Sequence, residues 1–166
     1  SKLFKTSIFE NVKMGNAQAS DEEVMNALRL ARCEDILAKF PEREKTVIGS
    51  KGVHLSGGEI QRVAIARAIL KNADIIILDE ATAAVDTENE AFIQAAIDDL
   101  SRDKTVIMIA HHLNTIRDAD QIIVMDSGRI IDTGRHNALL ERCILYRKMV
   151  EDQNKVDNWK IKEVSL

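Results

Sequence analysis

The chain has 166 residues, of which 45% are apolar and 30% charged, the composition of an ordinary globular domain with a core of its own. A formal net charge of −4 argues against a nucleic-acid surface, because binding phosphates requires a clustered basic excess. No apolar run reaches the roughly 18 residues of a membrane span, and the two cysteines lack metal or disulfide spacing, so a reduced, cytosolic setting is expected.

Helices are predicted for the first seventy residues. Residues 20–23 read Ser-Asp-Glu-Glu, a capping box in which the first and last side chains bond backbone N–H groups at a helix start. A short helix is expected over 34–40, stopped at Pro41, followed by a loop over 42–54 and a longer helix over 56–70. The apolar positions at helical spacing are Val24, Ala27, Leu28, Ala31, Ile60, Val63, Ala64 and Ala68.

Three short apolar segments predict strands. Segments 73–80 (ADIIILDE) and 105–110 (TVIMIA) are expected to be buried on both faces, and 121–125 (QIIVM) is the third strand. A tight turn at 126–129 then returns the chain into a hairpin strand over 130–133.

Two further helices complete the predicted order of elements. Residues 87–90 form another Ser/Thr-x-x-Glu box that opens a helix, and a last amphipathic helix follows the hairpin. The expected inward positions are Phe92, Ile93, Ala96, Ile97 and Leu100 in the first, and Leu139, Leu140, Cys143, Tyr146 and Met149 in the second. Residues 151–166 are polar and poorly patterned, so an extension or a disordered tail is expected there.

The alternation of strands and helices after residue 72 indicates an α/β fold with a largely parallel sheet. Because the preceding residues lack strands, we expect a helical subdomain ahead of the sheet. The predicted organisation is therefore a helical part over 1–72, a sheet-containing part over 73–150 and a polar tail over 151–166.

The stretch 54–62 (HLSGGEIQR) places two glycines between a hydroxyl and a carboxylate at a helix start. One interpretation is a capped helix, with Ser56 as N-cap and Glu59 at the third helical position. However, Gly57 and Gly58 each cost about 1 kcal/mol against alanine within a helix. Glycine also leaves backbone N–H groups bare, so that an anion can approach the positive end of the helix. The pattern by itself leaves both interpretations open.

Acidic and imidazole side chains follow the first two predicted strands. Asp79 and Glu80 stand at a carboxyl edge of the sheet, where open α/β sheets bind ligands. One carboxylate could hold Mg²⁺ through water while the other orients an attacking water, although acids also often end strands in solvent. His111 and His112 follow the second strand, and His111, nearer its end, could face a phosphate.

Three motifs occur in the order and spacing of one family. LSGGEIQRVAIARAIL, IIILDEATAAVD and IAHHLNTIRDAD resemble the nucleotide-binding domain of ABC transporters, and the likeness extends to about Asp152. The flanking LFKTSIFENV and GRIIDTGRHNALL resemble the exporter type, in which membrane and nucleotide-binding domains share one chain. The fold implied by this resemblance is the P-loop NTPase-like (RecA-like) fold, here incomplete, with a helical subdomain that carries the signature loop.

The resemblance also implies the signature loop and its partners. The residues that match this loop are Leu55, Ser56, Gly57, Gly58 and Glu59. In the family, the loop covers the γ-phosphate of an ATP held by a second nucleotide-binding domain in a head-to-tail dimer. ATP hydrolysis then drives substrate movement through the attached transmembrane domain, with the nucleotide-binding domains at the cytoplasmic face of the membrane.

Four further residues take roles from the same resemblance. Asp79 would hold Mg²⁺, and Glu80 would polarise the hydrolytic water. His111 would contact the γ-phosphate, and Asp86 would communicate across the dimer. The chain departs from the family's usual residues at Glu59, where glutamine is more frequent, and also at Ser50, Lys51 and Ala83.

The phosphate-cradling motif G-x-x-x-x-G-K-[ST] does not occur in the sequence. We therefore expect the C-terminal part of a nucleotide-binding domain, soluble and inactive as an ATPase alone. The family's P-loop strand would lie between the strands at 105–110 and 121–125. These two strands should either pair directly or leave edges for another molecule, including self-association.

Three other functions stay open at this point. One is an ABC ATPase that acts on DNA, which the acidic charge disfavours. Another is a non-enzymatic interaction module that presents the signature loop to a complete partner. The third is an importer-type subunit, separate from its membrane partner.

Overall fold

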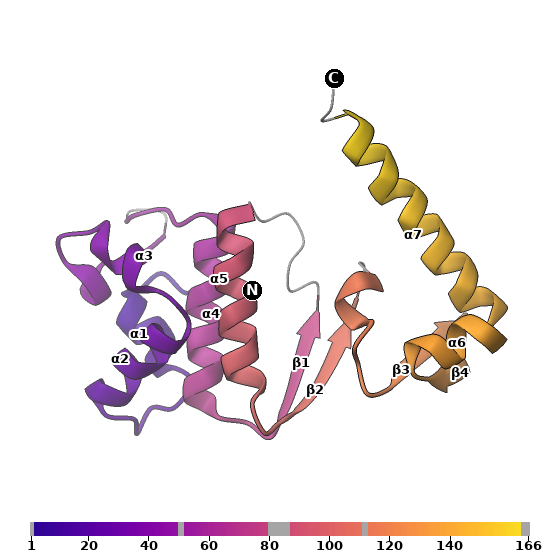
Figure 1. Cartoon of the computed structure of the whole chain (residues 1–166). Coiled ribbons are helices and arrows are strands. Elements are labelled where there is room, and N and C mark those ends of the chain that lie inside the picture. Colours follow the sequence, from indigo (N-terminus) through magenta and orange to yellow (C-terminus); the bar gives the residue numbers. More distant parts are fainter. Residues whose placement is uncertain (1, 50–51, 80–86, 111–112, 164–166) are drawn as a thin grey trace. The chain divides into compact units, whose positions relative to one another are not determined.

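The computed structural model describes residues 2–49, 52–79, 87–110 and 113–163 (Figure 1). Its elements, in chain order, are α1 (Ile8–Lys13), α2 (Asp21–Leu30), α3 (Glu34–Ala38), the 3₁₀ turn η1 (Arg43–Lys45), α4 (Gly57–Lys71), β1 (Ile75–Asp79), α5 (Thr87–Ser101), β2 (Thr105–Ile109), the 3₁₀ turn η2 (Leu113–Ile116), β3 (Ile122–Asp126), β4 (Arg129–Gly134), α6 (His136–Arg142) and α7 (Ile144–Glu163). The predicted helices and strands before residue 130 are found within a few residues of their expected ends.

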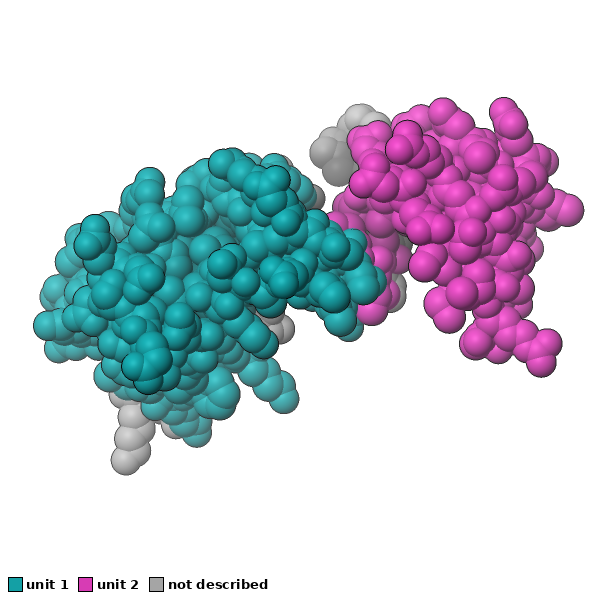
Figure 2. Space-filling model, turned by 90° about the horizontal axis from the view of Figure 1, so that it is seen from below, with its two compact units in different colours: residues 1–107 teal, residues 108–166 magenta. Residues whose placement is uncertain are grey.

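Contacts divide the chain into two compact units, residues 1–107 and 108–166, which Figure 2 shows in different colours. The predicted boundaries after residues 72 and 150 separate the helical part, the sheet-containing part and the tail of a nucleotide-binding domain, and they stay predictions. Across the residues that the structure describes, no helix is both long and apolar enough to cross a lipid bilayer.

Helix α4 lies at the centre of the first unit, where it packs against α1, α2 and α5. The predicted capping box of α2 is confirmed: Ser20 N–H donates to Glu23 Oε2 at 2.7 Å, and Glu23 N–H donates to Ser20 Oγ at 3.2 Å. Fully buried apolar side chains of the helices in this unit include Ile8, Val12, Val24, Leu28, Ile36, Val63 and Ile93. Phe92 was expected inward but is 37% exposed.

The segment before α1 is fastened to α4 by polar contacts in the interior. Asn11 has no exposed surface, and its Oδ1 accepts from Phe4 N–H at 2.8 Å and from Arg67 Nη2 at 2.8 Å. Its Nδ2 donates to the carbonyl oxygens of Phe4 and Ser7, and Arg67 Nε donates to the carbonyl of Asn11 at 2.7 Å. The chain before α1 is therefore held to the middle of α4 by a single buried amide and one guanidinium.

Strands β1 and β2 form a two-stranded parallel sheet, with both arrows pointing the same way in Figure 1. Thr105 N–H donates to the carbonyl of Asp74 at 3.0 Å, which pairs the beginnings of the two strands. Ile76 is buried, but Ile75 is 60% and Ile77 66% exposed. The prediction that this strand is buried on both faces is wrong for this chain, because only one face is covered by its own residues.

Strand β2 is exposed in the same way, with Ile107 49% and Ile109 50% exposed. Strands β2 and β3 belong to different sheets, so the described residues do not show direct pairing of the segments predicted at 105–110 and 121–125. Whether these two strands pair directly or leave edges that another molecule binds therefore stays a prediction.

The second unit is built on the antiparallel hairpin of β3 and β4. The predicted turn is confirmed: Ser127 and Gly128 both have positive φ, 49° and 75°, as hairpin turns of this length require. One face of the hairpin packs on α6 and α7 around a small cluster that contains Val124, Leu139 and Tyr146. His136 Nδ1 lies 2.9 Å from the Tyr146 hydroxyl inside this cluster.

The last helix differs from its prediction in three respects. It is divided into α6 and α7, because Cys143 has extended dihedral angles (φ −96°, ψ 103°). Helix α7 then continues to Glu163, through most of the segment predicted as a tail. Met149, expected inward, is 43% exposed.

We expect Asn11→Ala to lower the free energy of unfolding by about 1–3 kcal/mol, because it removes several hydrogen bonds and takes the side-chain acceptor from Phe4 N–H and Arg67 Nη2. Urea denaturation followed by circular dichroism measures the change. The matched control is Asn26→Ala on the exposed face of α2, expected within about 0.5 kcal/mol of wild type. Equal effects at both positions would contradict a role for Asn11 as anchor.

Candidate functional site

The glycine stretch at 55–59 forms the start of α4. Ser56 is the N-cap, with extended dihedral angles (φ −65°, ψ 165°) that turn the chain into the helix. Its Oγ accepts from Glu59 N–H at 3.3 Å, and Glu59 Oε2 accepts from Ser56 N–H at 2.7 Å. The capping interpretation of this stretch is therefore confirmed, and it fixes the loop from both ends.

The two glycines have different surroundings. Gly57 is exposed, and a Cβ atom added there would meet nothing within 4 Å. Gly58 is buried. First-turn N–H groups of a helix have no acceptor within the helix, and they carry the positive end of its dipole. The surface at Gly57 is thus open to an anion that approaches along the axis of α4.

The carboxylate of Glu59 is held by a lysine from another helix. Lys39, the C-cap residue of α3, places Nζ 2.5 Å from Glu59 Oε1, and the side chain of Glu59 is only 9% exposed. Burial raises the pKa of Glu59, but hydrogen bonds from Lys39 and Ser56 lower it more, so its pKa lies below the usual range. The same bond raises the pKa of Lys39, and both groups are therefore charged at neutral pH.

Arg62 fixes the same end of α4 to its neighbours. It is 1% exposed, and it forms a two-pronged ion pair with Asp35 of α3 at 2.7 and 2.9 Å. It also donates to the carbonyl of Arg32, and its guanidinium carbon lies 5.0 Å from the centre of the Phe92 ring on α5. Phe92 is thus partly exposed because its ring covers a buried cation rather than the apolar core.

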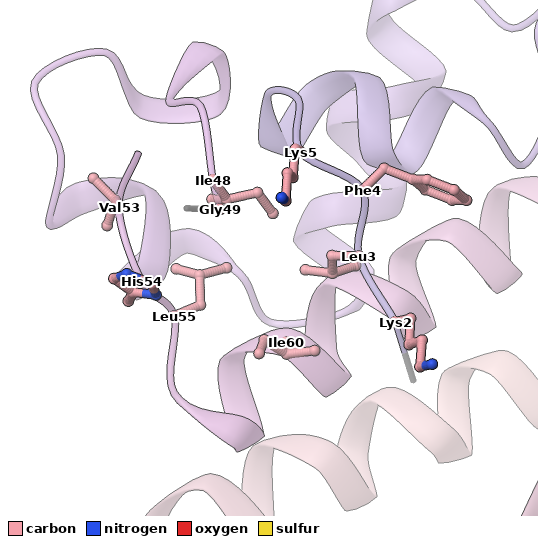
Figure 3. Close-up of a pocket in the computed structure, with 10 residues that line it drawn as sticks. All are labelled: Lys2, Leu3, Phe4, Lys5, Ile48, Gly49, Val53, His54, Leu55 and Ile60. Carbon is pink, nitrogen blue, oxygen red and sulfur yellow. The ribbon is translucent and has the colours of Figure 1, made fainter. Parts of the chain in front are cut away.

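A pocket of about 330 Å³ lies behind the loop, between the chain at 2–5 and the segment that leads into α4 (Figure 3). Leu55 and Ile60 line it together with Leu3. Leu55, the apolar residue of the loop, therefore lies in a pocket with other apolar side chains, whereas Gly57 lies at the exposed start of the helix.

The remaining candidate residues are only partly described. Asp79 is the last residue of β1 and is exposed. Glu80, Asp86 and His111 lie outside the described residues, so their predicted roles stay untested. The ends of β1 and β2 share one edge because the strands are parallel neighbours, which places Asp79 at the edge that His111 follows in the sequence.

Comparison with known proteins identifies the family. The profile of the ABC transporter family matches residues 1–83, half of the chain. The chain belongs to this family. The incomplete α/β fold of this family, expected from the sequence, is confirmed by a bacterial Atm1-family ABC exporter with ATP bound, which superposes with a TM-score of 0.82. That structure is 43% identical in sequence and covers 92% of this chain, which matches 27% of the exporter's chain.

Curated relatives belong to the same family. ABC transporter B family member 4 of Dictyostelium discoideum is 46% identical over 151 residues, 91% of this chain and 20% of its own length. An ATP-dependent lipid A-core flippase of Chromobacterium violaceum is 47% identical over 148 residues, 89% of this chain and 25% of its own length. The chain thus spans about a fifth to a quarter of these family members.

Three interactions at this site were not predicted from the sequence. They are the Lys39–Glu59 pair, the Arg62–Asp35 pair and the bond of Arg67 to Asn11. Each joins residues 20 to 56 positions apart, so no local pattern reports them. Arg62 gave no local signal either, because at about 100° per residue it lies on the side of the helix opposite to Ile60 and Ala64, which were predicted to be on the apolar face.

Acid should weaken the attachment of α4 to α3. Burial raises the pKa of Asp35, but the hydrogen bonds and charge of Arg62 lower it more, so this pKa lies below its ordinary value of about 4. A lowered carboxylate pKa stabilises the fold above the pKa of the unfolded chain, and this contribution is lost as the pH falls through the lowered value. The partly exposed pair should contribute about 1 kcal/mol.

Asp35→Asn should therefore lower the free energy of unfolding by a constant amount between pH 8 and about 5, and the difference from wild type should shrink below about pH 4. Urea unfolding across this pH range measures it. Glu141→Gln, an exposed position of α6, is the control for losing one carboxylate. A difference between wild type and Asp35→Asn that grows on acidification would refute the assigned sign.

Proposed function

We propose that this chain is part of the ATP-binding and ATP-hydrolysing domain of an ABC exporter, and that its loop 55–59 closes over the terminal phosphate of an ATP held by a second such domain. The observation that carries the proposal is the capped start of α4, where Gly57 leaves a positive helix end open at the surface. The similarity to an exporter with ATP bound supports the same nucleotide.

The described residues fit ATP with Mg²⁺ in specific ways. The helix start at Gly57 accommodates an anion without moving any side chain, because nothing lies within 4 Å of a Cβ placed there. Among the described residues, no group of three His, Cys, Asp or Glu side chains could hold a metal ion. Mg²⁺ bound to nucleotide phosphates needs only one or two carboxylates, and Asp79, the last residue of β1, would supply one.

The other roles follow the family resemblance. Glu80 would polarise the hydrolytic water, a contribution typically worth about 10²–10⁴ in rate. His111 would contact the γ-phosphate, and Asp86 would communicate across the dimer. Hydrolysis of the ATP would release the closed pair of domains, and a transmembrane domain, on whose cytoplasmic side these domains lie, would convert that release into substrate movement.

Gly57→Asp in the full-length protein tests the proposal. The structure has room for this side chain, and an acidic residue in the first turn of α4 favours the helix, so the fold should not be weakened. The added charge should nevertheless oppose the phosphate, and ATP-dependent association of the two domains should fall at least tenfold. Analytical ultracentrifugation with a slowly hydrolysed ATP analogue measures the association.

Gly57→Asn is the matched control, because it adds the same bulk without charge. It should lose much less of the association than Gly57→Asp. Full ATP-dependent association of the aspartate variant would refute the proposed role of the loop.

Since the sequence holds no phosphate-cradling motif, we expect this chain alone to bind ATP weakly and to hydrolyse it far below the usual enzyme range of about 1 s⁻¹ or more. A coupled ATPase assay on the purified 166-residue chain measures this. Mixing it with an intact domain of the family should instead give ATP-dependent association, through the loop at 55–59. Turnover at about 1 s⁻¹ by the chain alone would contradict the expectation.

A further inference from the structure

Glu59 introduces a negative charge at the point where the proposed function requires an anion to bind. It stands in the first turn of α4, two residues after Gly57, and its side chain is 9% exposed. Water screens a buried carboxylate poorly, so an unpaired charge there would repel a phosphate at the helix start. Glutamine, the more frequent residue of the family at this position, would not cause this repulsion.

Both oxygens of the Glu59 carboxylate have partners. Oε2 accepts from Ser56 N–H at 2.7 Å, which completes the helix cap. Oε1 accepts from Lys39 Nζ at 2.5 Å. A neutral glutamine oxygen could accept the same hydrogen bond from Ser56 N–H. Lys39 is therefore the partner that specifically neutralises the negative charge of Glu59.

The other charged groups near this pair are themselves engaged. Arg62 directs both terminal nitrogens to Asp35, at 2.7 and 2.9 Å, and that pair holds α3 against α4. Lys39 directly follows α3, so the same contact brings its side chain to Glu59. Its own side chain is 54% exposed and reaches the carboxylate from the solvent side.

We propose that Lys39 is a positioning residue of the signature loop: it neutralises the Glu59 carboxylate so that the start of α4 can accept the terminal phosphate of a nucleotide. Lys39 acts through Glu59 and does not itself contact the nucleotide. The inference rests on the proposed function. It adds that the acidic form of the loop, with Glu59, depends on a cation from α3.

A double-mutant cycle in the full-length protein tests this role through the ATP dependence of ATP hydrolysis. Lys39→Met should raise the ATP concentration for half-maximal activity about three- to tenfold, with a smaller change in kcat, because repulsion acts on closure over the phosphate. In the Glu59→Gln background the same Lys39→Met change should have no effect. Lys39→Arg should keep the wild-type ATP dependence.

Salt gives a second readout. Raising the ionic strength from about 0.05 to 0.5 M should reduce the ratio between Lys39→Met and wild type, because salt screens the uncompensated charge. Lys155→Met removes a lysine of similar exposure, paired with Asp152 in α7, and should leave the ATP dependence unchanged. Urea unfolding of each variant checks that the fold is kept.

The outcomes separate this inference from the proposed function. A wild-type protein that neither hydrolyses ATP nor associates in its presence overturns the proposed function and this inference with it. An active wild type whose Lys39→Met variant is unimpaired overturns this inference alone. A Lys39→Met defect that persists in the Glu59→Gln background also overturns it, since Lys39 would then support the fold and not the charge.

Discussion

Two arginine side chains fix helix α4, and the position of the candidate site depends on them. Arg62 ties the helix to α3 and α5, while Arg67 ties it to the chain before α1 through Asn11. Five residues at about 100° each place the two arginines on different sides of α4. A helix held on two sides by charge-assisted bonds has a fixed axis, and the direction in which its open start points is fixed with it.

The proposed function sets two conflicting requirements on the start of α4. A carboxylate in the first turn stabilises a helix, both through the cap and through the dipole. The same carboxylate opposes any anion that uses the dipole. The Lys39–Glu59 pair lets the capping box remain while its net charge is cancelled, and Gly57 leaves the approach open. Cap and anion site, which the sequence pattern leaves as alternatives, are therefore compatible at one helix end.

What the sequence could predict was local. The capping boxes at Ser20 and Ser56 depend on residues three positions apart, and both form as expected. The hairpin turn at 126–129 could also be predicted, because Gly128 readily adopts the positive φ that such a turn requires. Phe92 was misplaced because its partner, the buried Arg62, lies thirty positions away in the sequence. The role of Lys39 was not predicted because its partner Glu59 is also distant in the sequence. The break between α6 and α7 at Cys143 was not predicted because no proline or glycine occurs there.

The exposed strands show how a correct sequence pattern can still mispredict burial. Ile75 and Ile77 point away from the helices and are more than half exposed, although their apolar run is typical of a strand covered on both faces. An apolar run predicts that both faces of a strand are covered, but it does not show whether the covering residues belong to the same chain segment. Relatives roughly three and a half to four and a half times as long as this chain have residues that could cover such a face. The proposed function gives this cover a physical source, the remainder of a nucleotide-binding domain, which would also complete the edge where Asp79 ends β1.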